Sequence, residues 1–290
     1  MKIFIDKPLF GGVNSLRQTP LYSGAIQNSF ASPIPGTDYD FYYIREPNKY
    51  YSWIPKKKRI WIMMENPKIW KPSREFLDWY GYIVTPFPLE NGDYKQIKSH
   101  PSVPWFYGVK YQTDRGVLHI PSSDDVLSFE DIVRSNPPKK KLLSIISSTK
   151  VFTPGHKWRF SLAKRLKELL TDNVDIFGFG HTPISDKREA LDPYKFTIVI
   201  ENHEHDNYWT EKLSDALLAG CIPLYSGAPN ISEYFSHEIP QFNYMSDLDI
   251  ALRQILYLLE SSAITYPTCQ WKDEILNRHN LYSHLPSLFS

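Results

Sequence analysis

The sequence predicts an α/β protein built from two halves, each holding a parallel sheet. Short runs of apolar and β-branched residues alternate with helical patterns, most clearly in the second half of the chain. The segment Arg134–Lys141 combines a proline pair with a lysine run, which indicates a linker. Because 290 residues suffice for two ordinary domains, we predict an N-terminal domain over residues 1–138 and a C-terminal domain over residues 139–290.

Strand patterns dominate the first half, where helical patterns are weak. The strands expected there are Lys2–Ile5, Phe41–Ile44, Ile60–Met64 and Tyr82–Thr85. The second half alternates strands with helices, which favours a doubly wound parallel sheet. Its expected strands are Leu142–Ser147, Val174–Phe177, Phe196–Ile200 and Ile222–Tyr225, and its expected helices are Lys157–Leu170, one beginning near Glu211, Leu248–Glu260 and Lys272–Arg278. The pattern leaves open whether the last helix packs back on the first domain.

The clearest candidate site follows the buried strand Phe196–Ile200. Glu201 and Asn202 leave the carboxyl end of this strand, the edge where open α/β sheets bind ligands. Thr210 is the expected N-cap of the next helix, so Lys212 lies in its first turn. A lysine there opposes the positive end of the helix dipole, whereas an anion would bind both the ammonium and the free backbone N–H groups. The turn therefore indicates a diphosphate site, with an ordinary solvated lysine as the alternative.

A second candidate is Arg159, in the first turn of the helix expected from Lys157. Leu162, Ala163 and Leu166 follow it at helical spacing, so Arg159 lies on the apolar stripe of that helix. A cation in that position needs a partner. From the residues alone, one possible partner is a carboxylate, with Glu201 as the first choice.

The third candidate, Glu65, lies in the other half. The apolar run Ile60–Met64 is followed at once by Glu65 and Asn66, so this carboxylate also leaves the tip of a strand. If the two domains face each other, the strand tips border one cleft and Glu65 lies opposite the anion site. The alternative is that Glu65 is a solvated turn residue before Pro67.

These segments together resemble the signature of the α-1,3/1,4-fucosyltransferase family, glycosyltransferase family 10, in its compact bacterial or viral type. That signature has a Tyr-Lys-Phe lead-in, an apolar strand ending in Glu-Asn, a Tyr-x-Thr-Glu-Lys segment opening a helix, and a proline-containing strand that runs into glycine. The matching residues are Tyr194, Lys195, Phe196, Glu201, Asn202, Tyr208, Thr210, Glu211, Lys212, Pro223 and Gly227. The chain departs from the pattern at Ile200, where the family often has an aromatic residue, and at the insert 203–207, whose sequence is not typical. It departs again at Met64, where the family has a glycine before Glu-Asn.

The resemblance implies a GT-B-like fold, with two Rossmann-like domains facing a cleft. It implies inverting transfer of L-fucose from GDP-fucose to a hydroxyl of an oligosaccharide acceptor. In this family Glu65 matches the residue thought to deprotonate the acceptor, and Arg159 and Lys212 match the groups that bind the diphosphate. The remaining donor contacts are expected from Asn202, Tyr208, Glu211 and Glu201.

Two alternatives remain at the level of sequence. A related transferase could use another nucleotide sugar, because contacts to the sugar ring are less motif-like than contacts to the diphosphate. A nucleotide-sugar or glycan binding protein without catalysis is the other, since Met64 replaces the motif glycine. The aromatic stretch Trp105–Tyr107 is interpreted as domain core or as a stacking surface for the acceptor sugar.

Composition excludes several other classes of protein. A formal net charge of +1 offers no general footprint for nucleic acid, and the lysine-rich stretches Lys56–Arg59 and Lys139–Lys141 are interpreted as solvated strand entrances. No apolar run reaches the length of a membrane span, and the amino-terminal one is too short for a signal peptide. Two distant cysteines, Cys221 and Cys269, do not suggest a disulfide framework. We therefore expect a cytoplasmic protein without an integral membrane segment.

No essential metal or cofactor is expected. Asp38 and Asp40 form an Asp-x-Asp pair of the kind that binds metal in some glycosyltransferases, but the pattern is short and lies far from the nucleotide half. His203 and His205 alternate on a loop without a third ligand at suitable spacing. The donor itself, GDP-fucose, would be the only nucleotide involved.

Overall fold

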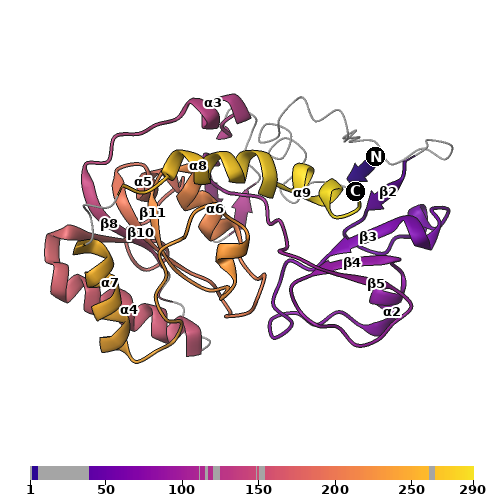
Figure 1. Cartoon of the computed structure of the whole chain (residues 1–290), viewed down its shortest axis with the longest axis horizontal. Coiled ribbons are helices and arrows are strands. Elements are labelled where there is room, and N and C mark those ends of the chain that lie inside the picture. The colour runs from indigo at the N-terminus through magenta and orange to yellow at the C-terminus, as the bar shows by residue number, and fades with distance from the viewer. Residues whose placement is uncertain are drawn as a thin grey trace.

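The protein folds into two lobes, each built around a parallel sheet (Figure 1), as seen in a computed structural model. The structure describes residues 2–5, 39–110, 112–114, 117–119, 125–147, 149, 154–260 and 265–290. The predicted α/β class with two parallel sheets is confirmed.

The first lobe holds a five-stranded parallel sheet with the strands in chain order. Its strands are β1 (Ile3–Ile5), β2 (Phe41–Tyr43), β3 (Arg59–Ile62), β4 (Tyr82–Thr85) and β5 (Lys95–Lys98). The first four match the prediction to within two residues at each end. The fifth was missed because its sequence, Lys-Gln-Ile-Lys, is mostly exposed at the sheet edge and carries no apolar alternation.

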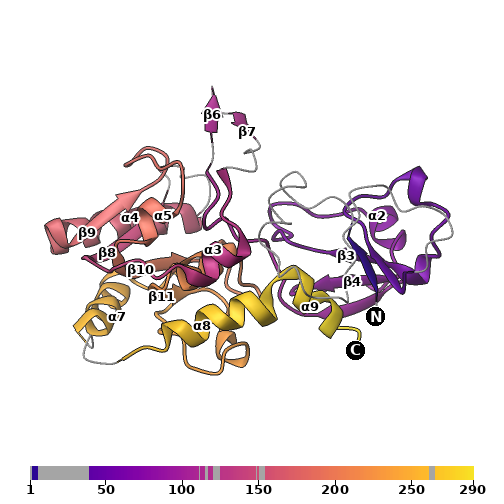
Figure 2. The same cartoon turned by 90° about the horizontal axis from the view of Figure 1, so that it is seen from above.

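One helix within the first lobe and one from the C-terminal end of the chain cover the two faces of this sheet. The short helix α2 (Arg74–Asp78) contributes Leu77 to one face. The other face is covered by α9 (Leu281–Ser287), whose Leu281, Tyr282 and Leu285 pack against the core side chains of β1, β3 and β4. Figure 2 shows the C-terminal helices passing from the second lobe to the first. The last helix therefore completes the core of the first lobe.

The second lobe holds a four-stranded parallel sheet in the order β11-β10-β8-β9. These strands are β8 (Lys141–Ile146), β9 (Val174–Phe177), β10 (Tyr194–Ile200) and β11 (Ile222–Ser226). From β8 the chain first pairs with β9 on one side and then with β10 on the other. The strand order reverses between β8 and β10, and such a switch point is where doubly wound sheets bind ligands.

Alternating side chains of β10 separate two cores in this lobe. Phe196, Ile198 and Ile200 point to one face, which α4 (Pro154–Leu170) and α7 (Leu248–Glu260) cover. Val199 points to the other, which α6 (Glu211–Leu218) and α8 (Thr268–Glu274) cover. Helix α4 begins three residues earlier than predicted, which places Arg159 in its second turn rather than its first.

Several short elements complete the described chain. They are α3 (Phe129–Arg134), α5 (Arg188–Leu191), the hairpin β6 (Gln112–Asp114) and β7 (Val117–His119), a π-helical continuation of α8 over Ile275–His279, and 3-10 turns at Lys49–Tyr51, Lys56–Lys58, Thr171–Asn173 and Ile231–Glu233. Across the described ranges, every helix is either too short or too polar to span a lipid bilayer. Cys221 and Cys269 are both free thiols.

The segment between the two sheets packs on the second lobe. Trp105, Tyr107 and Ile132 belong to the same core as α6 and α8. Asp215 of α6 is buried and accepts hydrogen bonds from the backbone N–H groups of Phe106 and Tyr107, at 2.7 and 2.8 Å. The boundary at residues 138/139 stays a prediction, and these contacts show that the segment before it is held by the second lobe.

Two cations expected to be solvated are structural. Lys139 donates to the carbonyl oxygens of Leu191, Asp192 and Ala219 at 2.7–3.3 Å. Arg59 is buried, and its guanidinium donates to the carbonyl oxygens of Ser52, Ile54 and Trp79. These hydrogen bonds to interior carbonyls join loops that lie far apart in the chain, and the local sequence does not reveal them.

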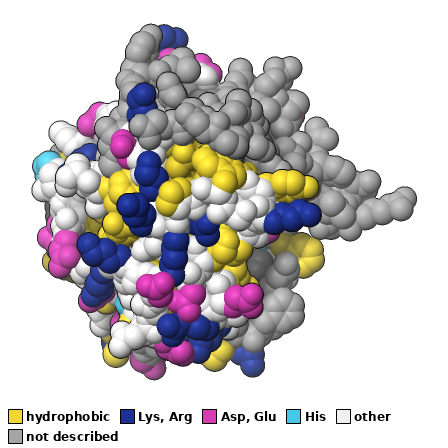
Figure 3. Space-filling view, turned by 90° about the vertical axis from the view of Figure 1, so that its right-hand side faces the viewer, with side chains coloured by type: hydrophobic (Ala, Val, Ile, Leu, Met, Phe, Trp, Pro, Cys, Tyr) yellow, Lys and Arg dark blue, Asp and Glu magenta, His cyan; other side chains and the backbone are white. Residues whose placement is uncertain are grey.

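The face of the first lobe in Figure 3 shows basic, acidic and hydrophobic side chains intermixed.

Three buried histidines connect the two lobes. His100 follows β5, whereas His279 and His284 come from the C-terminal segment, and the three rings lie 3.9–6.3 Å apart. His279 donates its Nε2–H to the carbonyl of Tyr234, and His284 shares a hydrogen bond with Ser99. Burial lowers the pKa of all three, to about 4 for His279 and about 3 for His284. The three imidazoles are therefore neutral at pH 7.

We predict that stability falls as the pH drops below about 6.5. The histidines titrate near 6.5 when unfolded but stay neutral in the fold, so unfolding takes up protons; at pH 5 each contributes about 2 kcal/mol less than at neutral pH. Urea unfolding at pH 7.5, 6 and 5 measures this loss. His279→Gln should reduce the slope between pH 6 and 5, whereas the exposed His237→Gln should leave it as in the wild type. An equal slope in all three proteins would contradict the assignment.

Candidate active site

The turn between β10 and α6 is organised by the buried carboxylate of Glu201. Its Oε1 accepts the backbone N–H of Thr210 at 2.8 Å, and its Oε2 accepts the Thr210 hydroxyl at 2.8 Å. The Nζ of Lys212 lies 3.3 Å from the same Oε2. The side chain of Glu201 is fully buried and holds the strand tip and the start of α6 together, while its predicted contact with the donor stays a prediction.

Thr210 occupies the N-cap position of α6, as predicted, but its side chain does not cap the helix. The hydroxyl donates to Glu201 and accepts from the Nζ of Lys212 at 2.9 Å. Burial would lower the pKa of Lys212, yet Glu201 and Glu211 outweigh burial and raise it. Lys212 is therefore a permanent cation at the start of α6, where the positive end of the helix dipole also lies.

Arg159 lies half-buried across from this turn. Its Nη2 is 3.5 Å from Oδ1 of Asn202, and it has no other hydrogen-bond or ion-pair partner among the described residues. The alternative of an internal salt bridge from Arg159 to Glu201 is not seen in the described part of the chain, because Glu201 pairs with Lys212. Burial lowers the pKa of Arg159, with Tyr244 and Glu201 opposing that shift. The guanidinium of Arg159 therefore lies near the tip of β10, and most of its N–H groups have no hydrogen-bond acceptor among the described residues.

A pocket of about 290 Å³ lies at the strand-order switch between β8 and β10. Arg159, Lys212 and Ser147 line it, together with Lys187, which the sequence analysis did not single out. Lys187 pairs with Asp215, which is buried in α6 and also holds the interlobe segment. Gly178 also lines this pocket. Its φ is 113°, and a Cβ there would lie 2.2 Å from the carbonyl oxygen of Ser147, so the position requires glycine. Three cations therefore surround a pocket at the position where such folds bind nucleotides.

The insert 203–207 is fixed by its own contacts. Asn207 has a positive φ of 65°, and its backbone N–H donates to Oδ1 of Asn230 at 2.7 Å. Tyr208 then leaves the second lobe and is buried in the core of the first, with its ring 5.0 Å from that of Phe87. Burial raises the pKa of the Tyr208 hydroxyl. The loop therefore joins the two lobes next to the candidate site.

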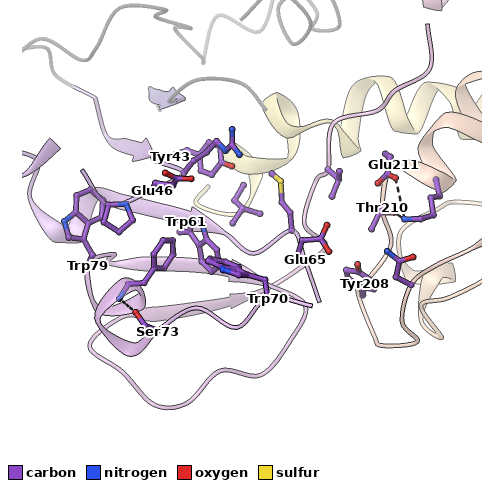
Figure 4. Close-up of a pocket in the computed structure, with 18 of the residues that line it drawn as sticks. Tyr43, Glu46, Trp61, Glu65, Trp70, Ser73, Trp79, Tyr208, Thr210 and Glu211 are labelled. Atoms are coloured by element: carbon purple, nitrogen blue, oxygen red, sulfur yellow. Dashed lines mark hydrogen bonds and ion pairs between the residues drawn. The ribbon is translucent and has the colours of Figure 1, made fainter. Parts of the chain in front are cut away.

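A larger cleft of about 900 Å³ separates the lobes and brings Glu65 opposite the start of α6. Figure 4 shows Glu65 between the aromatic side chains of the first lobe and Tyr208, Thr210 and Glu211 of the second. Partial burial raises the pKa of Glu65, Lys212 opposes that shift, and Glu211 adds to it. For Glu211, burial is outweighed by Lys212 and Lys187, which lower its pKa. Glu65 is the more basic of the two carboxylates.

Glu211 and Lys212 line both the cleft and the smaller pocket. They therefore stand where the two spaces meet. Of the seven predicted site residues, Arg159, Asn202, Glu211 and Lys212 gather at one strand edge, Glu65 faces them, and Glu201 and Tyr208 support the turn from within. Their individual roles stay predictions.

The remaining candidates do not join this site. Trp105 and Tyr107 are core residues, and only Phe106 of that stretch lines the cleft. Asp38 lies outside the described residues, and Asp40 is exposed and accepts the backbone N–H of Lys2. Within the described ranges, His100, His279 and His284 each bring one potential metal-ligand atom to within 4.8 Å of the others. His100 Nδ1 accepts the N–H of Ser102, so its proton sits on Nε2 and the triad lacks one lone pair that a metal would need.

Two parallel-sheet domains that face one cleft, with cations gathered at the strand-order switch of the second, define the GT-B class of glycosyltransferase fold. The model "Glycosyltransferase family 10 (fucosyltransferase) C-term" matches residues 136–280, which is half of the chain. The chain belongs to glycosyltransferase family 10. The family and fold predicted from the sequence are both confirmed.

Curated relatives match over part of the chain. A fucosyltransferase-like protein of Arabidopsis thaliana is 33% identical over 116 residues, covering 38% of this chain and 23% of that protein. The alpha-(1,3)-fucosyltransferase of Helicobacter pylori is 27% identical over 131 residues, covering 37% of this chain and 27% of that protein. The matches thus span about a quarter of the length of these relatives.

Solved structures resemble the whole chain. A crystal structure of alpha1,3-fucosyltransferase with GDP aligns with a TM-score of 0.51 at 19% identity, over 100% of this chain and 88% of that one. The corresponding structure with GDP-fucose gives a TM-score of 0.50 at 18% identity, over 100% and 89%. At this identity the likeness establishes the fold.

We predict that Glu201→Gln destabilises the protein by about 3 kcal/mol, because it removes the buried one of the two carboxylates beside Lys212 and turns an amide N–H₂ toward a cation or a donor. Urea unfolding at pH 7.5 measures the change. Glu204→Gln is the matched control, since Glu204 is exposed on the same loop, and it should shift stability by less than about 0.5 kcal/mol. Equal stability of the two variants would refute the positioning role of Glu201.

Proposed function

We propose that this protein transfers L-fucose from GDP-fucose to a hydroxyl of an oligosaccharide acceptor, with inversion at the anomeric carbon. The observation that carries the proposal is that Glu65 faces the cationic start of α6 across one cleft. Membership of a fucosyltransferase family supports the choice of donor, as does the similarity to fucosyltransferases of other organisms. One of these relatives, from Bos taurus, is a 3-galactosyl-N-acetylglucosaminide 4-alpha-L-fucosyltransferase, 35% identical over 104 residues and matched over 28% of its length.

Inversion requires one in-line displacement. Glu65 accepts the proton of the attacking acceptor hydroxyl, and its raised pKa brings it closer to the range of an efficient general base. The C–O bond from the anomeric carbon to the diphosphate breaks as the new glycosidic bond forms, and GDP leaves with the bonding electrons. Arg159 and Lys212 stabilise the charge that develops on the departing diphosphate.

We propose that this charge is neutralised without an essential metal. The support is the pair of cations that already lines the pocket, one with unused donors and one held ionised by its neighbours. Transfer in the presence of excess EDTA should stay within about twofold of the untreated rate, because the fixed cations supply the stabilisation that a metal would otherwise give.

Replacing either cation should weaken nucleotide binding. We expect Arg159→Ala and Lys212→Ala each to lower the affinity for GDP about tenfold or more, because charge-assisted hydrogen bonds to phosphate are lost. Titration calorimetry with GDP is the measurement. Lys157→Ala is the control, since Lys157 is exposed in the same helix two residues before Arg159 and should bind GDP normally. Wild-type affinity in both test variants would remove the diphosphate assignment.

Replacing the base should spare the donor site. We expect Glu65→Gln to keep GDP-fucose binding and lower transfer roughly 100- to 10,000-fold, since the amide cannot accept the proton. The measurement is transfer to a galactosyl-N-acetylglucosaminide at saturating donor, per folded molecule. Glu90→Gln, an exposed carboxylate that pairs with Lys71, is the control and should transfer at the wild-type rate. A wild-type rate in Glu65→Gln would move the base to another carboxylate.

Two other functions are separated by the same assays. A transferase of another nucleotide sugar would show in a panel of donors, read as a thermal shift, since a bound ligand raises the apparent stability. A binding protein without catalysis would bind GDP-fucose but release no GDP when the acceptor is added.

A cytoplasmic location is proposed as well, supported by the exposed free thiol of Cys269, which suits a reducing compartment.

A further inference from the structure

The first-lobe side of the cleft carries an aromatic wall made of Trp61, Trp70, Phe76 and Trp79. Trp61 packs edge-on against Trp70 and Phe76, with ring centroids 5.6 and 5.1 Å apart, and Trp70 packs edge-on against Phe76 at 5.4 Å. Arg59 lies 4.0 Å from the ring of Trp79 and fixes its position. Three of the rings therefore pack against one another, and the fourth, Trp79, packs against Arg59.

Trp70 is the most open member of this wall. It keeps 45% of its surface exposed, while Trp61 beneath it is buried. Large aromatic side chains left open in a cleft indicate a surface that a ligand covers. A sugar ring fits such a side chain, because its C–H face is apolar while its hydroxyls point outward to polar groups.

Charged side chains with unused hydrogen-bonding groups surround the wall. Arg45 and Glu46 follow β2, Glu75 lies in α2, and all three line the cleft without a hydrogen-bond or ion-pair partner among the described residues. With Glu65, the described first-lobe side of the cleft presents three carboxylates and one guanidinium. This side can hydrogen-bond sugar hydroxyls, and its excess of negative charge disfavours an anionic ligand.

Figure 4 shows Trp61 and Trp70 between Trp79 and Glu65. The wall therefore leads away from the candidate base. Because Arg159 and Lys212 belong to the pocket on the other side of the cleft, the wall is free for the acceptor.

We propose that this wall is the acceptor site and that it selects an uncharged oligosaccharide over an acidic one. Trp70 stacks on a sugar ring of the acceptor, and Glu46 and Glu75 set the preference for neutral sugars. This inference rests on the proposed function for the reaction but concerns a separate surface. Trp70 is a binding residue, and the two glutamates determine specificity.

The first experiment removes the stacking side chain. Trp70→Ala should raise KM for a neutral galactose and N-acetylglucosamine tetrasaccharide about tenfold, in the range expected for losing a central aromatic anchor. KM for GDP-fucose should stay unchanged, and Trp70→Phe should restore most of the acceptor affinity. Trp53→Ala is the matched control, because Trp53 is 37% exposed on the same lobe but does not line the cleft. An unchanged acceptor KM in Trp70→Ala overturns the proposal.

The second experiment tests charge selection. The wild type should use the neutral tetrasaccharide at least about fivefold better in kcat/KM than the same chain ending in sialic acid, because like charges repel across the cleft. The double variant Glu46→Gln/Glu75→Gln should lose most of this preference, and added salt should lower it in the wild type. Equal use of both acceptors by the wild type overturns the specificity claim.

Direct binding separates this proposal from the proposed function. Saturation-transfer NMR with the neutral tetrasaccharide and no donor should give a signal that Trp70→Ala loses and Trp53→Ala keeps. That result would support the wall even if GDP-fucose proved to be the wrong donor. If Trp70→Ala instead impairs only a lipid-linked acceptor and leaves the free tetrasaccharide unaffected, the wall binds an apolar chain and the proposal fails.

Discussion

The candidate site depends on one buried carboxylate. Glu201 ends the central strand β10 and binds the backbone, the hydroxyl and the ammonium of residues that open α6. A buried carboxylate is costly unless its oxygens are satisfied, and here both are. Because strand tip and helix start are joined by this group, Lys212 and the first-turn N–H groups have a fixed direction.

The same turn also determines how the two lobes meet. Between Glu201 and Thr210 the chain extends Tyr208 into the core of the first lobe. Asp215 of α6 holds the interlobe segment, and α9 completes the first sheet from the far end of the sequence. Tyr208 lines the cleft and Asp215 lines the smaller pocket, so two of these connections lie at the candidate site. The three buried, neutral histidines add a further contact between the two lobes.

The cleft is electrostatically divided. On the second-lobe side, Lys212 lines both the cleft and the smaller pocket, where Arg159 and Lys187 join it, and these cations suit a diphosphate. Its first-lobe side carries aromatic rings and carboxylates, which suit an uncharged sugar. Glu65 and Glu211 stand at the boundary, and their pKa values move in opposite directions because Glu211 lies closer to the cations. One carboxylate is thereby kept ionised while the other becomes a better base.

The sequence by itself determined the β10–α6 turn, the family and most of the second sheet, because those features rest on residues within one strand, one helix or one short motif. Helix α7 and strand β9 were predicted with their observed bounds for the same reason. Tertiary structure decided the rest: Glu201 is fully buried and supports the turn from within, Lys139 and Arg59 donate to interior carbonyls, and Trp70 lies on the first-lobe side of the cleft. These roles come from contacts between residues far apart in the chain, and local periodicity carries no information about such partners.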